Sequence, residues 1–503
     1  MTSQVDVLII GSGFSGIGMG VQLKRAGFDS FLILERGADV GGTWRDNSYP
    51  GCACDVPSHL YSFSYEKNPA WTRMYPTQTE IWDYLRDVTA RHGLRPSMRF
   101  DTEVKEAVFD EREGRWRVTT DRGDVVSAKV VTSCMGGLSR PQLPAIVGID
   151  RFRGPAFHSA RWDHSLDLTG KRVAVVGTGA SAIQFVPRIV PRVARLHLFQ
   201  RTAPWILPKP DRPLRPWERA LFRSLPAAMW VFRNFIYWRH ELLGIGYTLK
   251  PHYLAVAEHI ALRYLRRTVA DPALRAKLTP NYRIGCKRVL LTNDYLPSLT
   301  RANVELVTDA ISAVRERSIV TDDGVEREVD AIVYGTGFRT LDFTSPVRFV
   351  GPGGVELNEI WKTRAEAYLG VATAGFPNLF FITGPNSRLA NNSTLFMIET
   401  QIDYVVECLK HMRATGAATM SVRREAQQKF NAALRARFRR TVFAAGCQSA
   451  YLDESGESPV VWPGFSSEFW WKARRIRPAD FVLTWPARPG LRSSHVASRH
   501  SPA

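Results

Sequence analysis

Apolar runs near the start of the chain are spaced as in a strand–helix–strand unit. Residues 5–10 form a short, almost uninterrupted apolar run, which is typical of a buried parallel strand. A helix-like stretch covers residues 17–26, and a second apolar strand follows at residues 30–34. The pattern predicts one βαβ unit within about 30 residues.

The turn between the first predicted strand and the helix carries a glycine-rich motif. Glycines there allow a tight turn and let a pyrophosphate approach the helix N-terminus, where free N–H groups and the helix dipole stabilise negative charge. Glu35 ends the second strand, where it is placed to accept hydrogen bonds from a ribose. The motif predicts a dinucleotide site and consists of Gly11, Ser12, Gly13, Phe14, Ser15 and Gly16.

A second copy of this unit begins with a strand-like run at residues 171–176. Arg201 follows Gly177 by 24 positions, as Glu35 follows Gly11. An acid at this position favours a free ribose 2′-hydroxyl, whereas an arginine favours a 2′-phosphate. We therefore predict FAD at the first unit and NADPH at the second, with an unliganded surface charge as the alternative for Arg201. The second turn consists of Gly177, Thr178, Gly179, Ala180, Ser181 and Ala182.

The remaining pattern completes an α/β fold with two Rossmann-like dinucleotide-binding domains and a helical insertion. Strand-like runs in residues 98–131 predict a β-meander within the FAD domain. Long apolar-aromatic helices with interspersed arginines fill residues 204–283. The predicted parts are a discontinuous FAD-binding domain (1–145 and 341–478), an NADPH-binding domain (146–203 and 284–340), the helical insertion (204–283) and a disordered tail (479–503).

Composition and charge narrow the choice of partners. A content of 45% hydrophobic and 23% charged residues is that of globular proteins and excludes fibrous and disordered classes. The net charge of +19 is concentrated, because residues 201–290 hold 17 Lys and Arg against 5 Asp and Glu. No nucleic-acid-binding module accompanies these charges, so nucleic acid is not an expected partner. Residues 204–283 are compatible with peripheral membrane contact, or with a packed subdomain whose arginines reach solvent. The sequence leaves the oligomeric state open.

Six cysteines in 503 residues do not form a disulfide framework, and no pair has zinc-ligand spacing. The sequence lacks a basic leader and an apolar stretch of bilayer length, so we expect a cytoplasmic protein in a reducing setting, with peripheral membrane contact left open.

Two dinucleotide sites indicate an electron-transfer enzyme. Disulfide reductases need a redox cysteine pair close to the flavin, and Cys52 and Cys54 are the only two cysteines close in sequence. We interpret both as small thiols that fill space in the core. Oxygen is therefore the favoured electron acceptor.

Residues 152–163 read F-R-G-P-A-F-H-S-A-R-W-D, which matches the F-x-G-x-x-x-H-x-x-x-W-[P/D] fingerprint of the Baeyer–Villiger monooxygenases. The chain resembles this family, within the class B flavin monooxygenases, over about residues 5–475. Further matches are the C-K-R sequence at residues 286–288 and the F-P-N-L-F-F-I-T-G-P sequence at residues 376–385. The fingerprint positions are Phe152, Gly154, His158, Trp162 and Asp163, and a signature after the first unit comprises Gly41, Gly42, Thr43, Trp44, Tyr49, Pro50, Gly51 and Asp55.

The resemblance implies a role for each matching residue. Arg288 matches the family's active-site arginine, and Asp55 matches the aspartate that orients it. Arg201, Thr202 and Lys287 match residues that contact the NADPH phosphate. His158 matches a histidine that couples domain movement to catalysis, with general-base action as the alternative, and Trp162 is interpreted as packing. Trp44 and Tyr61 are expected to line or support the flavin pocket, and Ala450 departs from the tryptophan common in relatives.

The activity implied by the resemblance is oxygen insertion beside a ketone carbonyl. NADPH reduces FAD, oxygen then forms a C4a-peroxyflavin, and its attack on a small apolar ketone gives an ester or lactone. Two alternatives remain at this point. One is a flavin monooxygenase that oxidises sulfides or amines, and the other is a non-catalytic flavin redox sensor or membrane-associated protein.

Overall fold

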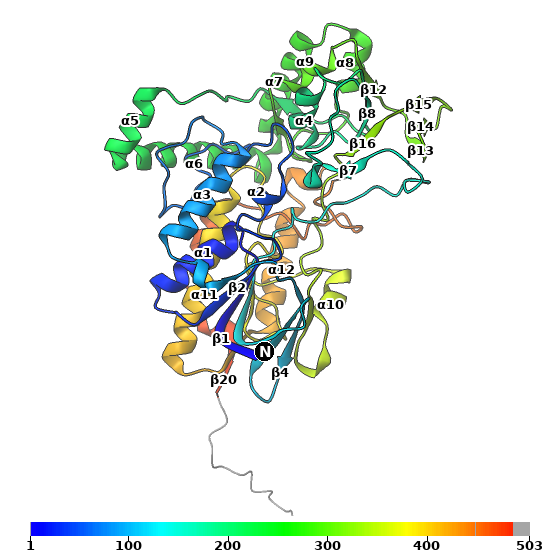
Figure 1. Ribbon diagram of the computed structural model, residues 1–503. Helices are drawn as coiled ribbons and strands as arrows, with labels where there is room; N and C mark the ends of the chain where they lie inside the picture. The colour runs from blue at the N-terminus through cyan, green and yellow to red at the C-terminus, as the bar shows by residue number, and fades with distance from the viewer. Residues whose placement is uncertain (1, 448, 486–503) are drawn as a thin grey trace, which may run out of the picture.

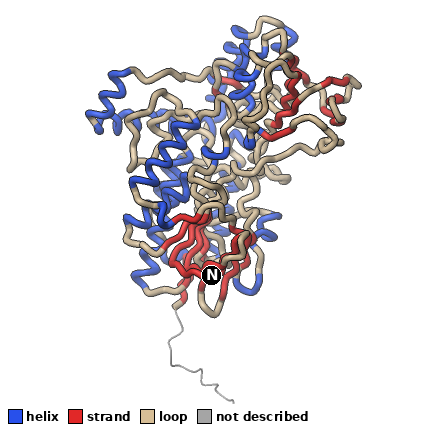
Figure 2. Tube along the Cα trace, in the orientation of Figure 1, coloured by secondary structure: helices blue, strands red, loops and turns tan. Residues whose placement is uncertain are grey.

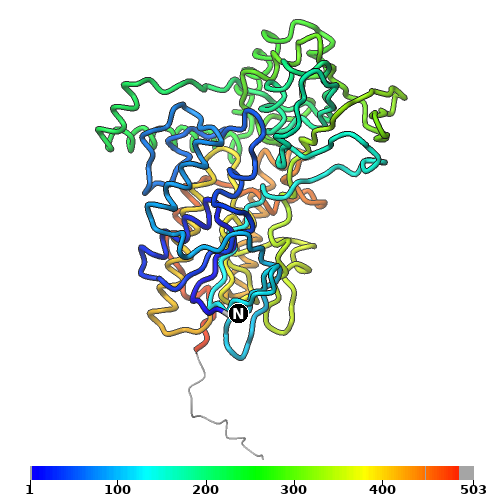
Figure 3. The backbone as a smooth tube through the Cα atoms, viewed as in Figure 1, coloured from blue at the N-terminus to red at the C-terminus, as the bar shows by residue number. Residues whose placement is uncertain are grey.

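The structure is a computed structural model that describes residues 2–447 and 449–485. Two separate sheets, each with helices on its faces, occupy the two ends of the molecule (Figure 1). The colours along the backbone show that the chain leaves the first sheet, builds the second and then returns to the first (Figure 3). Each sheet is therefore assembled from two separated stretches of sequence.

The first sheet has the strand order β17-β4-β5-β6-β1-β2-β3, with β18 paired to β6. Its central strand β1 pairs in parallel with β2 and β6 and is apolar on both faces, so residues 7–10 are buried. The antiparallel β4–β5–β6 ladder confirms the predicted meander. The strands are β1 (Thr2–Ile10), β2 (Phe31–Leu34), β3 (Met98–Arg99), β4 (Val104–Asp110), β5 (Arg115–Thr120), β6 (Val125–Ser133), β17 (Arg348–Val350) and β18 (Leu379–Phe381).

Helix α1 (Phe14–Arg25) joins β1 to β2 and covers one face of this sheet together with α3 (Gln78–Arg91) and α11 (Thr394–Thr415) (Figure 2). Thr77 caps α3 through a reciprocal pair of hydrogen bonds with Glu80. The other α-helices of this domain are α2 (Thr43–Asp46), α10 (Leu357–Thr363), α12 (Arg424–Phe438) and α13 (Ser466–Ala473).

The second sheet is parallel throughout, with the order β12-β9-β8-β16-β7. Its central strands are apolar and buried, and α4 and α9 pack beside them around a core that includes Val173, Phe185 and Leu198. The predicted fold of two Rossmann-type sheets is confirmed. The elements are β7 (Ala156–His158), β8 (Arg172–Val176), α4 (Ala182–Ile189), β9 (Arg195–Phe199), α9 (Tyr295–Leu299), β12 (Val304–Val307) and β16 (Ala331–Tyr334).

The helical insertion extends from the second domain toward the side of the first domain where α3 lies, with α5 at its outer end (Figure 1). Its longest helix, α6, buries Arg233 and Glu241 on the side that faces the first domain. Among residues 2–447 and 449–485, no helix combines the length and apolarity that a bilayer span requires. The helices are α5 (Pro216–Ser224), α6 (Pro226–Thr248), α7 (Ala255–Thr268) and α8 (Pro272–Leu278).

Three small sheets complete the fold, and one of them corrects the predicted tail. Residues 479–485 are not disordered, because β20 pairs antiparallel with β19 and buries Phe481. The rest of the predicted tail, residues 486–503, lies outside the described residues. The strands are β10 (Ile206–Leu207), β11 (Leu290–Leu291), β13 (Ile311–Val314), β14 (Ser318–Thr321), β15 (Glu326–Glu328), β19 (Thr419–Val422) and β20 (Phe481–Thr484).

A disulfide joins Cys286 to Cys447 across 161 positions, with a Cα–Cα distance of 6.3 Å. This bond departs from the reducing setting expected for the cysteines. The sequence could not indicate it, because the pairing depends on the chain's return to residue 286 from a distant segment. Its position is notable, since Cys286 directly precedes Lys287 and Arg288.

Candidate active site

A cavity of about 730 Å³ lies between the two predicted dinucleotide turns. Its volume falls in the range of cofactor and substrate sites. The lining comes from both Rossmann units and from α6, which contributes His240, Leu243 and Tyr247. The predicted site residues that line it are Gly11, Gly13, Phe14, Ser15, Glu35, Gly42, Thr43, Trp44, Asp55, Tyr61, Gly179, Ala180, Ser181 and Arg288.

The first turn is closely packed and keeps a helix terminus open to a ligand. Gly11 has φ +98°, and a Cβ on Gly16 would lie 1.8 Å from the Gly11 carbonyl oxygen, so neither position accepts a side chain. A Cβ on Gly42 would lie 3.1 Å from the Gly13 Cα atom. No side chain caps the N-terminus of α1, which leaves its N–H groups free for an anion. The turn therefore fits a pyrophosphate.

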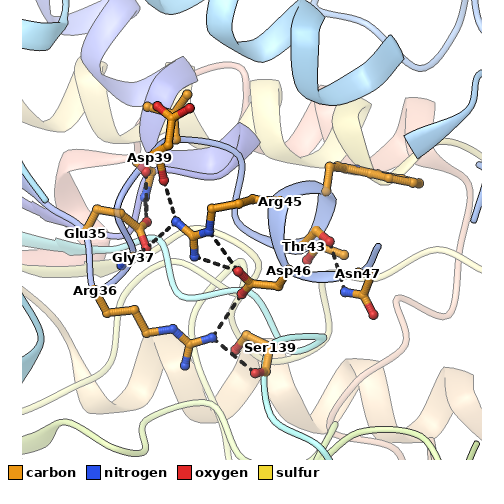
Figure 4. Close-up of polar contacts among 12 residues, drawn as sticks. Glu35, Arg36, Gly37, Asp39, Thr43, Arg45, Asp46, Asn47 and Ser139 are labelled. Atoms are coloured by element: carbon orange, nitrogen blue, oxygen red, sulfur yellow. Dashed lines mark hydrogen bonds and ion pairs between the residues drawn. The ribbon is translucent and has the colours of Figure 1, made fainter. Parts of the chain in front are cut away.

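Glu35 is placed at the end of β2 as predicted, but its carboxylate is already fully engaged (Figure 4). It accepts hydrogen bonds from the Ser12 amide and hydroxyl at 2.9 and 2.8 Å, and from the Gly37 amide at 2.8 Å. Arg45, which sequence reasoning missed, donates the fourth at 2.8 Å. Burial raises the pKa of Glu35, but Arg45 and these donors hold it below its usual value. A ribose hydroxyl at Glu35 must replace one of these donors.

The second turn repeats the architecture of the first. Gly177 has φ +106°, and a Cβ there would lie 2.5 Å from the Gly335 carbonyl oxygen. The N-terminus of α4 also has no side-chain cap. Burial lowers the pKa of Lys287, and the charge of nearby Arg201 lowers it further. Two like charges in close range fit a phosphate group, which supports a phosphorylated ribose at this turn.

Arg288 and Asp55 meet on the cavity wall although 233 positions separate them. The Arg288 Nε atom donates to Asp55 Oδ2 at 3.0 Å, and a second N–H of the guanidinium donates to the same oxygen. Burial raises the pKa of Asp55, but Arg288 holds it below its usual value. The Arg288 side chain is 41% exposed, so the guanidinium faces the open cavity while it stays paired.

Two further residues that the sequence did not indicate support this pair. Lys209 donates from Nζ to the Cys54 carbonyl oxygen at 3.0 Å, and its charge also lowers the pKa of Asp55 after the larger effects of burial and Arg288. Gln184, on α4, donates to the Ala53 carbonyl oxygen at 2.9 Å. Neither belongs to a recognisable motif, because each acts through a contact between distant segments. Together they fix the segment that carries Asp55 against the second unit.

Aromatic side chains form another part of the wall. Trp44 Nε1 donates to the Tyr61 hydroxyl at 3.1 Å, and their rings meet edge to face with centroids 5.5 Å apart. Phe14 lies 5.4 Å from the Tyr61 ring. These contacts give the first turn an aromatic boundary on one side of the cavity.

Comparison with known proteins identifies the family. The family described as "pyridine nucleotide-disulphide oxidoreductase" matches residues 8–232. A Baeyer–Villiger monooxygenase of Streptomyces coelicolor is 48% identical over 485 residues, covering 96% of this chain and 93% of the relative. A Baeyer–Villiger monooxygenase of Pseudomonas aeruginosa is 46% identical, covering 95% of this chain and 91% of the relative. The chain belongs to the Baeyer–Villiger monooxygenase family.

Solved structures agree with this assignment. An oxidised steroid monooxygenase bound to NADP has a TM-score of 0.85 and 32% identity, with 96% of this chain and 100% of that chain covered. Cyclohexanone monooxygenase from Rhodococcus sp. Phi1 bound to NADP⁺ has a TM-score of 0.87 and 28% identity over the same shares of the two chains. The predicted class, a flavoprotein monooxygenase with two dinucleotide-binding units, is confirmed.

The fingerprint of the family lies away from the cavity wall. His158 Nδ1 accepts a hydrogen bond from the Ala160 amide at 3.1 Å and caps a short 3₁₀ turn. Trp162 packs between Phe157 and Phe185, with a centroid distance of 5.3 Å to each ring. These contacts agree with a structural interpretation of both side chains. The remaining predicted residues that do not line the cavity are Gly16, Phe152, Gly154, Asp163, Gly177, Thr178, Arg201, Thr202 and Lys287.

The cysteines near the first unit do not form a redox pair in this monooxygenase. Cys52 and Cys54 are both free thiols. Burial raises the pKa of Cys52 to about 12 and raises that of Cys54 as well. Thiols held in the protonated form are poor nucleophiles, which agrees with the expectation that these side chains fill space.

Proposed function

We propose that this protein catalyses the reaction of a ketone with O₂, NADPH and a proton to give an ester or lactone, NADP⁺ and water. The observation that carries the proposal is the Arg288 guanidinium, which Asp55 holds on the wall of a cavity shared by two dinucleotide turns. Family relatives with the same overall fold include monooxygenases of cyclohexanone and steroids. A ketone is accordingly the substrate class that this site supports best.

The cofactors are assigned to the two turns by their electrostatics. FAD, when bound, accepts the hydride of NADPH and activates oxygen. The free N–H groups of α1 bind its pyrophosphate, and Glu35 orients its ribose. The second turn binds the NADPH pyrophosphate, while Arg201 and Lys287 bind the 2′-phosphate, with Thr202 beside them. The aromatic wall of Trp44 and Tyr61 keeps water from the reacting groups.

Arg288 supplies a fixed positive charge beside the reacting oxygen atoms. A guanidinium stays protonated, so it stabilises developing negative charge without itself losing a proton. Asp55 is a positioning residue, because its carboxylate holds two of the N–H groups and aims the others into the cavity. His158 and Trp162 position the linker between the domains.

We propose domain limits that agree with the strands of each sheet. We assign residues 1–145 and 341–478 to the FAD-binding domain, and 146–203 and 284–340 to the NADPH-binding domain, with 204–283 as the insertion. In support, the first sheet uses strands from residues 2–133 and 348–381, and the second uses strands from 156–199 and 304–334. Strand β20 extends the first domain to residue 484, because it pairs with β19.

The direct test is turnover of a ketone panel with NADPH and with NADH, with product masses measured. We expect ester or lactone products and faster NADPH oxidation when a ketone is added. Products from sulfides or amines but never from ketones would favour the heteroatom alternative. Bound FAD without any substrate-stimulated NADPH oxidation would favour the non-catalytic alternative.

We also infer that the insertion contacts the surface of an anionic membrane. Helix α6 exposes apolar side chains to solvent, while its buried side carries Arg233 and Glu241 beside Ile236 and other apolar residues. The charged side chains exposed near these apolar residues are arginines rather than acids. Their positive charge would attract anionic lipid headgroups. The exposed residues are Trp230, Val231, Phe235, Trp238 and Leu242.

Sedimentation with vesicles tests this contact. We expect binding to vesicles of anionic lipid, weaker binding to zwitterionic vesicles, and loss of binding in the triple variant Trp230→Gln, Phe235→Gln, Trp238→Gln. A matched control replaces Leu143 and Val147, which are similarly exposed on the linker. Equal binding of both variants, or a dimer through this face in solution, would contradict the inference.

A further inference from the structure

Arg388 brings a second guanidinium to the cavity, on the loop between β18 and α11. The loop is fixed, since the Arg388 amide donates to the Val460 carbonyl oxygen at 3.1 Å and its own carbonyl accepts from the Trp462 amide at 2.9 Å. The side chain reaches across to Gly137, where a Cβ would lie 1.4 Å from Arg388 Nη2. A side chain at residue 137 would therefore exclude the guanidinium from its present position.

The Arg388 guanidinium has no carboxylate within 4.0 Å among the residues that the structure describes, unlike Arg288. Its electrostatic neighbours are instead Arg288 and Tyr451. Burial lowers its pKa, and the charge of Arg288 lowers it further, although Tyr451 opposes this effect. Each acidic residue that lines the cavity is already paired with a cation other than Arg388. The pairs are Glu35 and Asp46 with Arg45, Asp55 with Arg288, Glu103 with Lys105, and Asp342 with Arg140.

A positive charge enclosed in this way is costly to the protein unless an anion binds to it. The phosphates of the cofactors already have binding sites in the proposed assignment. These are the N-termini of α1 and α4 and the pair of Arg201 and Lys287. Arg388 lines the same cavity as Arg288, and the charges of the two guanidinium groups interact. The anion is thus expected on the substrate.

We propose that Arg388 binds a carboxylate on the ketone substrate, so that the preferred substrates are keto acids with an apolar chain between the two groups. The inference rests on the proposed function and specifies its substrate class. A carboxylate matches the forked donors of a guanidinium with two parallel hydrogen bonds. Apolar side chains beside Arg388, including Leu389, Leu395 and Val461, line the path that the chain of such a substrate would follow.

The test compares 9-oxodecanoate with its methyl ester, using the FAD-loaded enzyme. We expect the wild type to favour the acid in kcat/KM, and Arg388→Leu to reduce the ratio of acid to ester by about 10-fold or more, mainly through KM. Arg388→Lys keeps the charge without the fork and should restore part of the ratio. Arg112→Leu, which removes an exposed arginine elsewhere, serves as the matched control.

An unchanged ratio of acid to ester in Arg388→Leu would overturn this inference, whether both activities persist or both fall equally. Loss of bound FAD, measured by flavin absorbance, would also overturn it, because it would assign the charge to the cofactor. Binding of 9-oxodecanoate, followed by calorimetry, gives a readout that does not need turnover, and equal affinity in wild type and Arg388→Leu would also overturn the inference.

The outcomes separate this inference from the proposed function. Failure to form an ester from any ketone, neutral or acidic, would contradict the proposed function. Ester formation from neutral ketones without a preference for the acid would contradict only the role of Arg388.

Discussion

Removal of the Arg288 side chain tests how the cavity stabilises charge. In Arg288→Ala the reacting oxygen loses a guanidinium whose remaining N–H groups face the cavity, since Asp55 engages only two of them. The loss of one well-placed donor to a developing oxyanion costs about 3–4 kcal/mol, or roughly 10²–10³ in kcat. We expect ester formation to fall by at least that factor, because the variant also leaves Asp55 without its main partner.

The assay should follow ester by mass and NADPH by absorbance, with FAD content measured in the same samples. We expect FAD to stay bound, because Arg288 lies outside the first turn, and NADPH oxidation to yield hydrogen peroxide in place of ester. Arg73→Ala is a suitable control, since Arg73 pairs with Asp211 at 2.9 Å and its side chain is 39% exposed, close to the 41% of Arg288. A normal ester yield in Arg288→Ala, or an equal loss in Arg73→Ala, would refute the reasoning.

Three other predictions concern the cofactor phosphate, the disulfide and pH. Replacing Arg201 and Lys287 with glutamine should shift the kcat/KM ratio of NADPH to NADH by about 10-fold or more toward NADH, since each removes a charged partner of the 2′-phosphate; an unchanged ratio would contradict the assignment. Replacing Cys286 and Cys447 with serine should lower the free energy of unfolding by about 2–4 kcal/mol, measured by denaturant unfolding without reductant; reductant should lower that of the wild type similarly but leave the variant unaffected. The depressed pKa of Asp55 means that its pairing stabilises the fold above its ordinary pKa of 3.8 and is lost as pH falls through the lower folded value. The free energies of unfolding of wild type and Asp55→Asn should therefore differ at pH 5 and above and become equal in stronger acid. A difference that persists in strong acid would contradict this role of Asp55.

The two dinucleotide turns were predictable because their signals are local. Each lies within one strand–turn–helix segment, so the spacing from Gly11 to Glu35 and from Gly177 to Arg201 is determined by short-range geometry. The pairing of Arg288 with Asp55 is a long-range contact, and it became an expectation only through resemblance to the family. The engagement of Glu35 by Arg45 was not predicted, because Arg45 reaches back across a loop of ten residues.

Other features depend on how distant segments meet, and the sequence carries no mark of them. Lys209 supports Asp55 from a proline-rich stretch without a motif. Helix α6 buries a charged side chain, since Glu241 accepts hydrogen bonds from Ser466 and Ser467 at 2.7 Å. The carboxylate can be buried beside apolar residues such as Ile236 because these partners satisfy it. The hydrophobic pattern of residues 226–248 could not indicate that orientation.

The most direct measurement of the central claim is the fate of labelled oxygen. The FAD-loaded protein is incubated with NADPH, ¹⁸O₂ and a panel of ketones, and the products are analysed by mass spectrometry. The account predicts an ester or lactone that carries one ¹⁸O atom, with the second labelled atom released as water. Labelled hydrogen peroxide as the sole product, or labelled sulfoxide without any ester, would contradict it.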